Sequence, residues 1–222
     1  MEQKPKQTKS KERVRAHGEV FTAEREVKAM CDLVKDEAER IDSRFLEPAC
    51  GDGNFLAEIL MRKLAVVKRK YGRSYLDYEK NAVLAVSSIY GVDILIDNVL
   101  ACRARMFAIW DKEYKAVCKK DCNDQTREAV MFILSRNIVC GNALTLKCVD
   151  ENANDTDEPI IFSEWAFVTG SNLQRSDYTF AELLAQNDEP TTKQQTLFAD
   201  TPEEGVFLKK YVTHYRRVQE NG

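Results

Sequence analysis

Histidine is scarce in this sequence, and its cysteines lack the spacing of a metal site. The 222 residues include two histidines, His17 and His214, and seven cysteines without a paired CxxC arrangement. Cys118 and Cys122 lie four apart on an expected helix, but no second His/Cys pair accompanies them. A structural zinc site needs four such ligands at short spacings. We therefore expect no bound metal, and reduced thiols rather than disulfides.

Long apolar runs are also missing. No stretch approaches the roughly 20 apolar residues that a helix needs to cross a bilayer, and the polar start of the chain lacks the apolar core of a signal peptide. We therefore predict a cytoplasmic protein that has no membrane partner.

The sequence has no overall excess of positive charge. Its net charge of -3 and pI near 5.6 argue against a protein that coats nucleic acid over its whole surface. Basic residues do gather at the start, namely Lys4, Lys6, Lys9, Lys11, Arg13 and Arg15. We interpret residues 1–16 as a solvated, disordered tail and keep a phosphate contact as the alternative.

The remaining chain has the composition of one globular unit, because 44% of its residues are hydrophobic. Apolar residues recur at helical spacing in five segments, and short apolar runs lie between them. The expected helices span residues 23–41, 54–70, 76–87, 97–120 and 123–135, and the expected strands span 44–46, 89–93 and 137–140. Thr22 and Asp97 are the expected N-caps of the first and fourth helices. This alternation predicts an α/β fold with a parallel sheet and helices on both of its faces.

The pattern decays after residue 147. We expect a polar loop over 150–159, one strand or a bent hairpin over 160–168, and a short helix over 177–186. The domain organisation predicted is therefore a globular domain over 17–147, an irregular extension or partner interface over 148–186, and a flexible tail over 187–222.

A glycine pair follows the first expected strand. The segment Leu46-Glu47-Pro48-Ala49-Cys50-Gly51-Asp52-Gly53-Asn54-Phe55-Leu56 runs from that strand into a helix. Glycine lets the backbone turn sharply and approach a ligand closely. Leu56 stands where a dinucleotide fingerprint needs its third glycine, so a pyrophosphate cofactor is disfavoured. Glu47 at the strand tip can attract the cationic amino group of S-adenosylmethionine; a helix-cap acid is the alternative.

A second acidic residue, Asp93, ends the next expected strand. Carboxylates at this place in parallel sheets hydrogen-bond ribose hydroxyls. Taken alone, Asp93 could equally be a turn former. Its occurrence together with Glu47, after successive strands, favours a nucleoside-binding site.

Four segments between about residues 16 and 146 resemble the gamma-type adenine-specific DNA methyltransferases of restriction-modification systems. These segments are His17 to Thr22, Glu47 to Leu56, Tyr90 to Ile94 with Asn98 to Met106, and Gly141 to Leu144. The resemblance implies a Rossmann-like S-adenosylmethionine-dependent methyltransferase fold over 17–147, with an incomplete parallel sheet and a mobile C-terminal tail.

The same resemblance implies roles for ten residues. Phe21 and Thr22 would line the methionine side of the cofactor pocket. Glu47, Ala49, Gly51 and Gly53 would contact the cofactor. Asp93 would hold the ribose, Ile94 would cover the adenine, and Asn142 and Ala143 would bind the adenine ring. The family usually has Gly-Asp at the last motif, so Asn142 departs from it.

One family motif has no counterpart in the sequence. The family binds the flipped base through an Asn/Asp-Pro-Pro-Tyr/Phe tetrapeptide, and none exists here. The nearest candidate by position, Phe162-Ser163-Glu164-Trp165, has no proline and no amide. We interpret this segment as an edge strand with Trp165 and Phe167 packed on the core, and we assign no catalytic residue.

Two functional hypotheses remain open. In the first, the chain is the cofactor-binding part of a split or truncated adenine DNA methyltransferase. Its partners are then DNA and a second polypeptide that carries the catalytic motif and the recognition domain. In the second, it is a catalytically inactive methyltransferase-fold module for association with DNA or protein.

A last motif lies near the end of the chain. Gln194-Gln195-Thr196-Leu197-Phe198 has the form of peptides that dock on bacterial sliding clamps, through Gln194, Leu197 and Phe198. Such pentapeptides arise easily by chance. We favour the alternative, in which Leu197 and Phe198 fold back onto an apolar patch.

Overall fold

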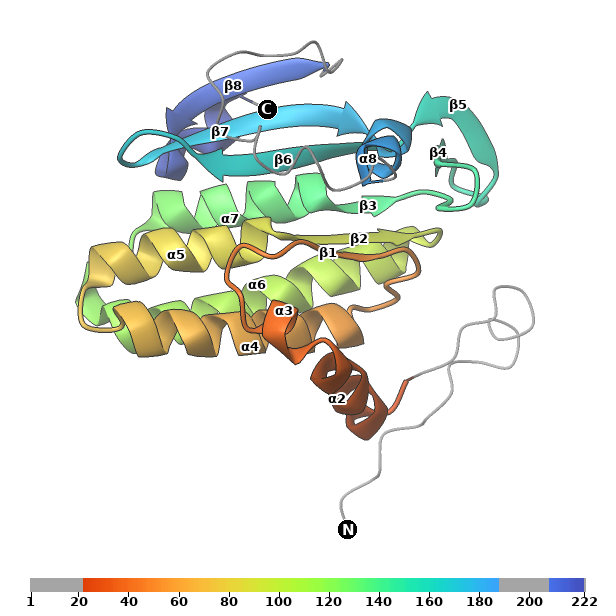
Figure 1. Cartoon of the computed structure of the whole chain (residues 1–222). Helices are drawn as coiled ribbons and strands as arrows, with labels where there is room; N and C mark the ends of the chain where they lie inside the picture. The colour runs from red at the N-terminus through yellow and green to blue at the C-terminus, as the bar shows by residue number, and fades with distance from the viewer. Residues whose placement is uncertain (1–21, 188–207, 222) are drawn as a thin grey trace.

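The computed structural model describes residues 22–187 and 208–221 and shows a mixed α/β architecture (Figure 1). The proposed basic tail, Phe21 and the clamp-like motif at Gln194, Leu197 and Phe198 lie outside the described residues. The core sheet contains three parallel strands in the order β1-β2-β3. These strands are β1 (Phe45–Glu47), β2 (Ile89–Asp93) and β3 (Ile138–Cys140). The predicted parallel sheet is confirmed.

Helices lead into and out of these strands. They are α2 (Glu24–Leu33), α3 (Lys35–Ala38), α4 (Asn54–Tyr71), α5 (Tyr75–Ser87), α6 (Ile96–Cys118) and α7 (Asp124–Asn137), with a short 3-10 turn η1 (Lys119–Asp121). On α4, Leu56, Leu60, Leu64 and Val67 recur at helical spacing and are fully buried or nearly so, which explains why the pattern predicted this helix. Gly72 ends α4, as expected.

Two expected N-caps are wrong. Ala23, not Thr22, occupies the N-cap of α2, where its backbone N–H points at the Glu26 carboxylate. Leu95, not Asp97, is the N-cap of α6, and its N–H donates to the Asp93 side chain. The side chain of neither N-cap residue forms a capping hydrogen bond.

Different elements pack against the two faces of the parallel sheet. Gly91 of β2 lies against Leu56 of α4, and α6 also contacts this face. Tyr90 on the opposite face meets Phe162 edge to face, with ring centroids 5.5 Å apart, and Phe162 meets Phe180 in the same manner at 5.3 Å. Phe162 belongs to a strand, so helices alone do not cover both faces, contrary to the expectation.

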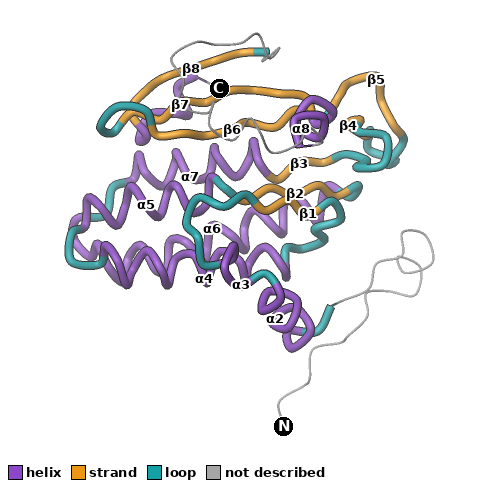
Figure 2. The backbone as a smooth tube through the Cα atoms, viewed as in Figure 1, coloured by secondary structure: helices purple, strands orange, loops and turns teal. Residues whose placement is uncertain are grey.

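That strand is part of a second, antiparallel sheet with the order β6-β7-β8 (Figure 2). Its strands are β6 (Ile161–Phe167), β7 (Asn172–Thr179) and β8 (Lys209–His214), and α8 (Phe180–Asn187) follows β7. β6 is an edge strand of this sheet, Trp165 is buried, and Phe167 packs against the core. This confirms the structural interpretation of the Phe162 to Trp165 segment.

Three sequence expectations for this region are wrong. The expected polar loop over 150–159 contains β5 (Asp155–Pro159), which pairs with β4 (Lys147–Val149). The expected short helix begins at Phe180, because residues 177–179 complete β7. The expected flexible tail includes β8 and a 3-10 segment, η4 (Tyr215–Asn221), whose Tyr215 and Val218 are buried in the core. Long-range packing therefore orders polar segments that show no clear periodicity.

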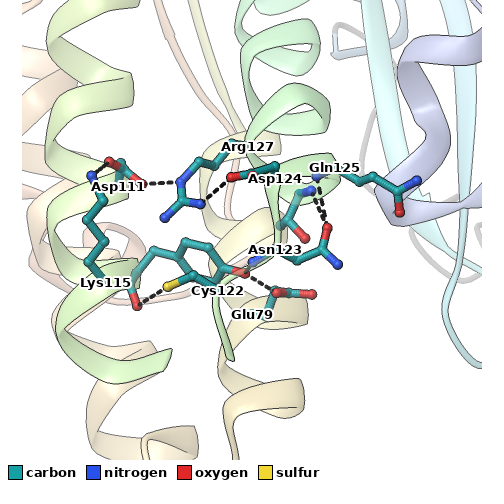
Figure 3. Close-up of polar contacts among 10 residues, drawn as sticks. Glu79, Asp111, Lys115, Cys122, Asn123, Asp124, Gln125 and Arg127 are labelled. Atoms are coloured by element: carbon teal, nitrogen blue, oxygen red, sulfur yellow. Dashed lines mark hydrogen bonds and ion pairs between the residues drawn. The ribbon is translucent and has the colours of Figure 1, made fainter. Parts of the chain in front are cut away.

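The corner between α6 and α7 is held by polar contacts (Figure 3). Asn123 caps α7 by accepting the backbone N–H groups of Gln125 and Thr126. Arg127 donates to Asp111 at 2.8 Å and to Asp124 at 2.6 Å. These contacts fix the direction in which the chain leaves α6.

Among the helices that the structure describes, none has the length and apolarity needed to cross a membrane.

Candidate cofactor site

The predicted site residues follow the strands of the parallel sheet. Glu47 ends β1, Asp93 ends β2, and Asn142 follows β3 by two residues. Parallel pairing brings the carboxyl ends of these strands to one edge, where Glu47 pairs with Gly91 and Asp93 with Cys140. In α/β sheets this edge is where ligands bind.

The glycine loop, residues 48–53, connects β1 to α4 at this edge. Gly51 and Gly53 both have left-handed backbones, with φ of 53° and 86°. A Cβ on Gly53 would lie 2.5 Å from Cys102 Sγ of α6, whereas a Cβ on Gly51 would meet no atom within 4 Å. Gly53 is therefore required by packing, while Gly51 faces open space that a ligand can occupy.

Asp93 ties the glycine loop to the end of β2. Its Oδ2 accepts the Gly51 N–H at 2.9 Å, and its Oδ1 accepts Leu95 N–H at 2.9 Å and Asn98 Nδ2 at 3.1 Å. The side chain is buried, with 9% of the residue exposed. Asp93 thus shapes the turn after β2, as the alternative interpretation held, and also sets the position of Gly51.

Arg105 of α6 restrains the same loop from the other side. It contacts Asn54 Oδ1 and lies 3.0 Å from Asp52 Oδ2. Arg105 lies in the Asn98 to Met106 segment that resembles the family, but the resemblance implied no role for this residue. Its place on the helix that follows the second strand was a further signal, since that helix begins at the same sheet edge.

Glu47 differs from the other polar groups of the site because its carboxylate has no partner among the residues that the structure describes. It is half-buried, and within the described residues no hydrogen bond or ion pair reaches its carboxylate. Burial raises the pKa of Glu47 above its usual value of 4.5. A half-buried carboxylate without a partner is a suitable site for a ligand cation.

The entry to β1 is fixed by a buried lysine. Lys63 of α4 donates to the Ile41 carbonyl at 3.1 Å, to Ser88 Oγ at 2.7 Å and to the Ser43 carbonyl. Burial lowers the pKa of Lys63 to about 7. These contacts join α4, the segment before β1 and the segment before β2, so they help to place Glu47 beside the glycine loop.

Asn142 is already bonded to its own neighbourhood. Its Nδ2 donates to Asp155 at 2.9 Å, and its Oδ1 accepts the Leu144 N–H at 3.0 Å. It therefore shapes the turn after β3, and its role toward adenine stays a prediction. Asn142 is still close to the edge, because the Gly141 N–H donates to the Asp93 carbonyl at 3.0 Å.

For the remaining predicted residues that it describes, the structure gives a position and a degree of burial but no polar side-chain contact with the other site residues. Ile94 and Ala143 are half-buried and follow β2 and β3, and Ala49 is exposed in the glycine loop. Thr22 is half-buried before α2, and in the described part of the chain no hydrogen bond joins it to the loop. The contribution of the Phe21 segment to the site stays a prediction.

Comparison with known proteins identifies a family for this chain. Residues 22–189 match the model of a family described as MmeI, DNA-methyltransferase domain, and this span includes the glycine loop, Asp93 and Asn142. No curated protein and no solved structure matches the chain.

Proposed function

The chain belongs to the MmeI DNA-methyltransferase domain family, a family of restriction-modification DNA methyltransferases, and we propose that it binds S-adenosylmethionine at the glycine loop. The observation that carries this proposal is the Glu47 carboxylate, which is half-buried and has no partner in the described structure. Neither a phosphate nor another anion suits this position, whereas the ammonium group of an amino-acid moiety does.

The shape of the loop fits the same cofactor. The space beside Gly51 is open where a side chain would otherwise stand, and Gly53 brings the start of α4 close behind it. No side chain caps the first N–H groups of α4, so they can donate hydrogen bonds to the carboxylate of the methionine moiety. Glu47 would hold the amino group, Asp93 the ribose, and Ile94 with Asn142 and Ala143 the adenine.

When bound, the cofactor supplies an electrophilic methyl group on its sulfonium sulfur. The chain's own residues then orient the cofactor: Asp93 keeps the Gly51 N–H in place, and Arg105 holds Asp52 and Asn54 on either side of Gly53. We propose adenine in DNA as the acceptor, which rests on the resemblance of the four sequence segments. The isolated chain lacks the tetrapeptide that binds the target amine.

We further propose that a second polypeptide supplies that tetrapeptide. β1 is an edge strand of the described parallel sheet, with β2 on one side and no described strand on the other. Its free N–H and C=O groups allow another strand to be added. The alternative is a catalytically inactive module that binds DNA or protein, which the missing tetrapeptide also favours.

Equilibrium dialysis with radiolabelled S-adenosylmethionine tests the binding proposal. The wild-type chain should bind the label saturably, and unlabelled S-adenosylhomocysteine, which keeps the amino group, should compete. Glu47→Gln should lower the affinity about tenfold or more, the effect of losing a charge-assisted hydrogen bond in a partly buried site. Glu164→Gln is the matched control, because Glu164 is also half-buried with a raised pKa but lies on β6. Absence of saturable binding by the wild type, with or without a partner, would reject the proposal.

A methyl-transfer assay separates the two accounts of function. The chain is mixed with a polypeptide that carries an Asn-Pro-Pro-Tyr motif and is encoded nearby, and methyl incorporation into duplex DNA is measured. Transfer by the mixture and not by either chain alone supports the split enzyme. If the chain binds the cofactor but neither the mixture nor the separate chains transfer methyl groups, the result supports the inactive module.

A further inference from the structure

A groove lies at the opposite end of the long helices from the glycine loop. It has a volume of about 540 Å³ and lies between the last turns of α4 and α6. Five of its lining residues are cationic: Lys68, Arg69, Lys70, Arg73 and Lys119. We call this the basic groove.

In the described part of the chain, most of these cations have no acidic partner. Lys68 pairs with Glu113 at 3.1 Å. For Arg69, Lys70, Arg73 and Lys119, which are all exposed, no ion pair occurs within the described residues. Neighbouring Lys115 and Arg127 differ, because both are bonded to Asp111, as Figure 3 shows. Four exposed cations without an ion pair in the described chain therefore lie together at the groove.

Helix ends do not account for this much charge. α4 and α6 both end here, and each helix C-terminus carries about half a negative charge. Those two ends and Glu113 together balance about two of the five cations, so about three positive charges remain. This surplus stands out because the whole chain has a net charge of -3.

Lys119 provides an independent observation. Its backbone has φ of 52° and ψ of -117°, in a region that side-chain-bearing residues rarely adopt. Glycine would remove this strain, and strained backbone outside glycine is concentrated at functional sites. A lysine at this position places a cation on the groove at the expense of stability.

We propose that the basic groove binds the phosphate backbone of duplex DNA at a distance from the cofactor site. The choice of DNA rests on the proposed function; the cationic character of the groove does not. α4 spans the interval between the two sites, and its 18 residues are about 27 Å long. This length corresponds to about eight base pairs of duplex, so a single DNA molecule is long enough to span the distance between the two sites.

Fluorescence anisotropy with a labelled 30-base-pair duplex, measured over a range of salt concentrations, tests this proposal. The Arg69→Gln/Arg73→Gln/Lys119→Gln variant should lower the slope of log affinity against log salt by about 2 to 3, since each lost phosphate contact removes about 0.9. Arg25→Gln/Lys209→Gln/Lys210→Gln is the control: it removes three exposed cations from α2 and β8 and should change the slope by less than 1. Equal losses in the two variants, an unchanged slope in the first, or no DNA binding by the wild type would overturn the proposal.

Two further measurements keep the result specific. Lys119→Gly should raise the melting temperature, because it relieves the backbone strain, and should weaken DNA binding, because it removes a cation. A lysine with a purely structural role would not give this combination. Cofactor dialysis on the same proteins should show unchanged affinity, so failure of the groove and failure of the cofactor site are distinguishable. Binding of the wild type to phosphatidylserine vesicles, but not to DNA, would replace the proposed partner by a membrane surface.

Discussion

Two glutamates show how differently the two ends of the molecule use a carboxylate. Glu79 of α5 is completely buried, yet it accepts hydrogen bonds from the hydroxyl groups of Tyr114 and Tyr215 and pairs with Arg216 at 2.6 Å. Glu47, at the other end of the helices, is only half-buried, but the described structure gives it no partner. The more deeply buried carboxylate is therefore the one whose charge is compensated by partners within the chain.

The difference separates structural from functional charge. The partners of Glu79 come from α6 and from η4, so this carboxylate connects the C-terminal segment to the helical layer. Glu47 connects nothing within the described chain, and its burial without compensation costs stability. We infer that the fold retains this cost because a cofactor cation supplies the missing partner.

The largest expected effect follows from Glu79. Glu79→Gln should lower the free energy of unfolding by about 3 kcal/mol, because it leaves the partly buried Arg216 without its counter-charge. Glu113→Gln is the control, since its pair with exposed Lys68 should contribute less than about 1 kcal/mol. Urea denaturation measures both. Similar small losses would mean that the Glu79 cluster does not hold the C-terminal segment.

Alanine substitutions at three glycines should give three different results. Gly53→Ala places a Cβ against Cys102 Sγ and should cost about 2 kcal/mol or more. Gly51→Ala and Gly170→Ala share a left-handed backbone, with φ of 53° and 60°, and open surroundings, so each should cost about 1 kcal/mol. Only Gly51→Ala of this matched pair should also abolish cofactor binding. Equal binding by both variants would place the cofactor elsewhere.

Asp93→Asn should affect stability and binding together. The carboxylate accepts from Gly51, Leu95 and Asn98, and an amide can no longer accept on both sides. We expect a loss of about 1–3 kcal/mol in unfolding free energy and weaker cofactor binding. Thermal unfolding with and without S-adenosylmethionine measures both. Full retention of the cofactor-induced stabilisation would contradict the role given to Asp93.

The smallest effect on stability, and the most specific, is expected for Glu47→Gln. Because burial raises the pKa of Glu47 in the folded chain, the folded state holds this proton over a pH window above 4.5 in which the unfolded chain has lost it. The Glu47 contribution to stability therefore falls as pH rises through that window, and the penalty persists at neutral pH. Glu47→Gln should remove it and slightly stabilise the protein at pH 7.

Cofactor affinity should show the opposite pH dependence in the wild type. The ionised carboxylate binds the ammonium group, so affinity should rise with pH through the same window and become nearly independent of pH in Glu47→Gln. Dialysis at several pH values checks this. A wild-type affinity that does not change across the window would mean that Glu47 is not the partner of the cofactor cation.

The parallel half of the fold was accessible from the sequence because its signals are local. Ile89–Asp93 is the strand that was expected, and α4 extends one residue beyond its expected end. The antiparallel sheet was not accessible in this way. β8 is polar, with two lysines and a histidine in Lys209–His214, and is ordered by pairing with β7 across a wide sequence separation.

The candidate site was predictable to a similar degree. Glycine spacing and an acidic strand end indicated Gly51, Gly53, Glu47 and Asp93, and the structure brings Asp93 to Gly51 by a direct hydrogen bond. The roles of Arg105 and Glu79 were not predictable, because a charged residue on a helix is normally a solvated one. The partners of these two side chains come from segments that are distant in the sequence, so only the packed structure identifies them.

The most direct test of the account is a titration of the isotope-labelled chain with S-adenosylmethionine, followed residue by residue through backbone amide NMR signals. We predict saturable shifts at Gly51, Gly53 and the first turn of α4, with a smaller response at Leu95 and Asn98. The amides around Glu79 and Tyr215 should not respond. Absence of shifts at the glycine loop, or shifts confined to the opposite end of the helices, would contradict the assignment of the cofactor site.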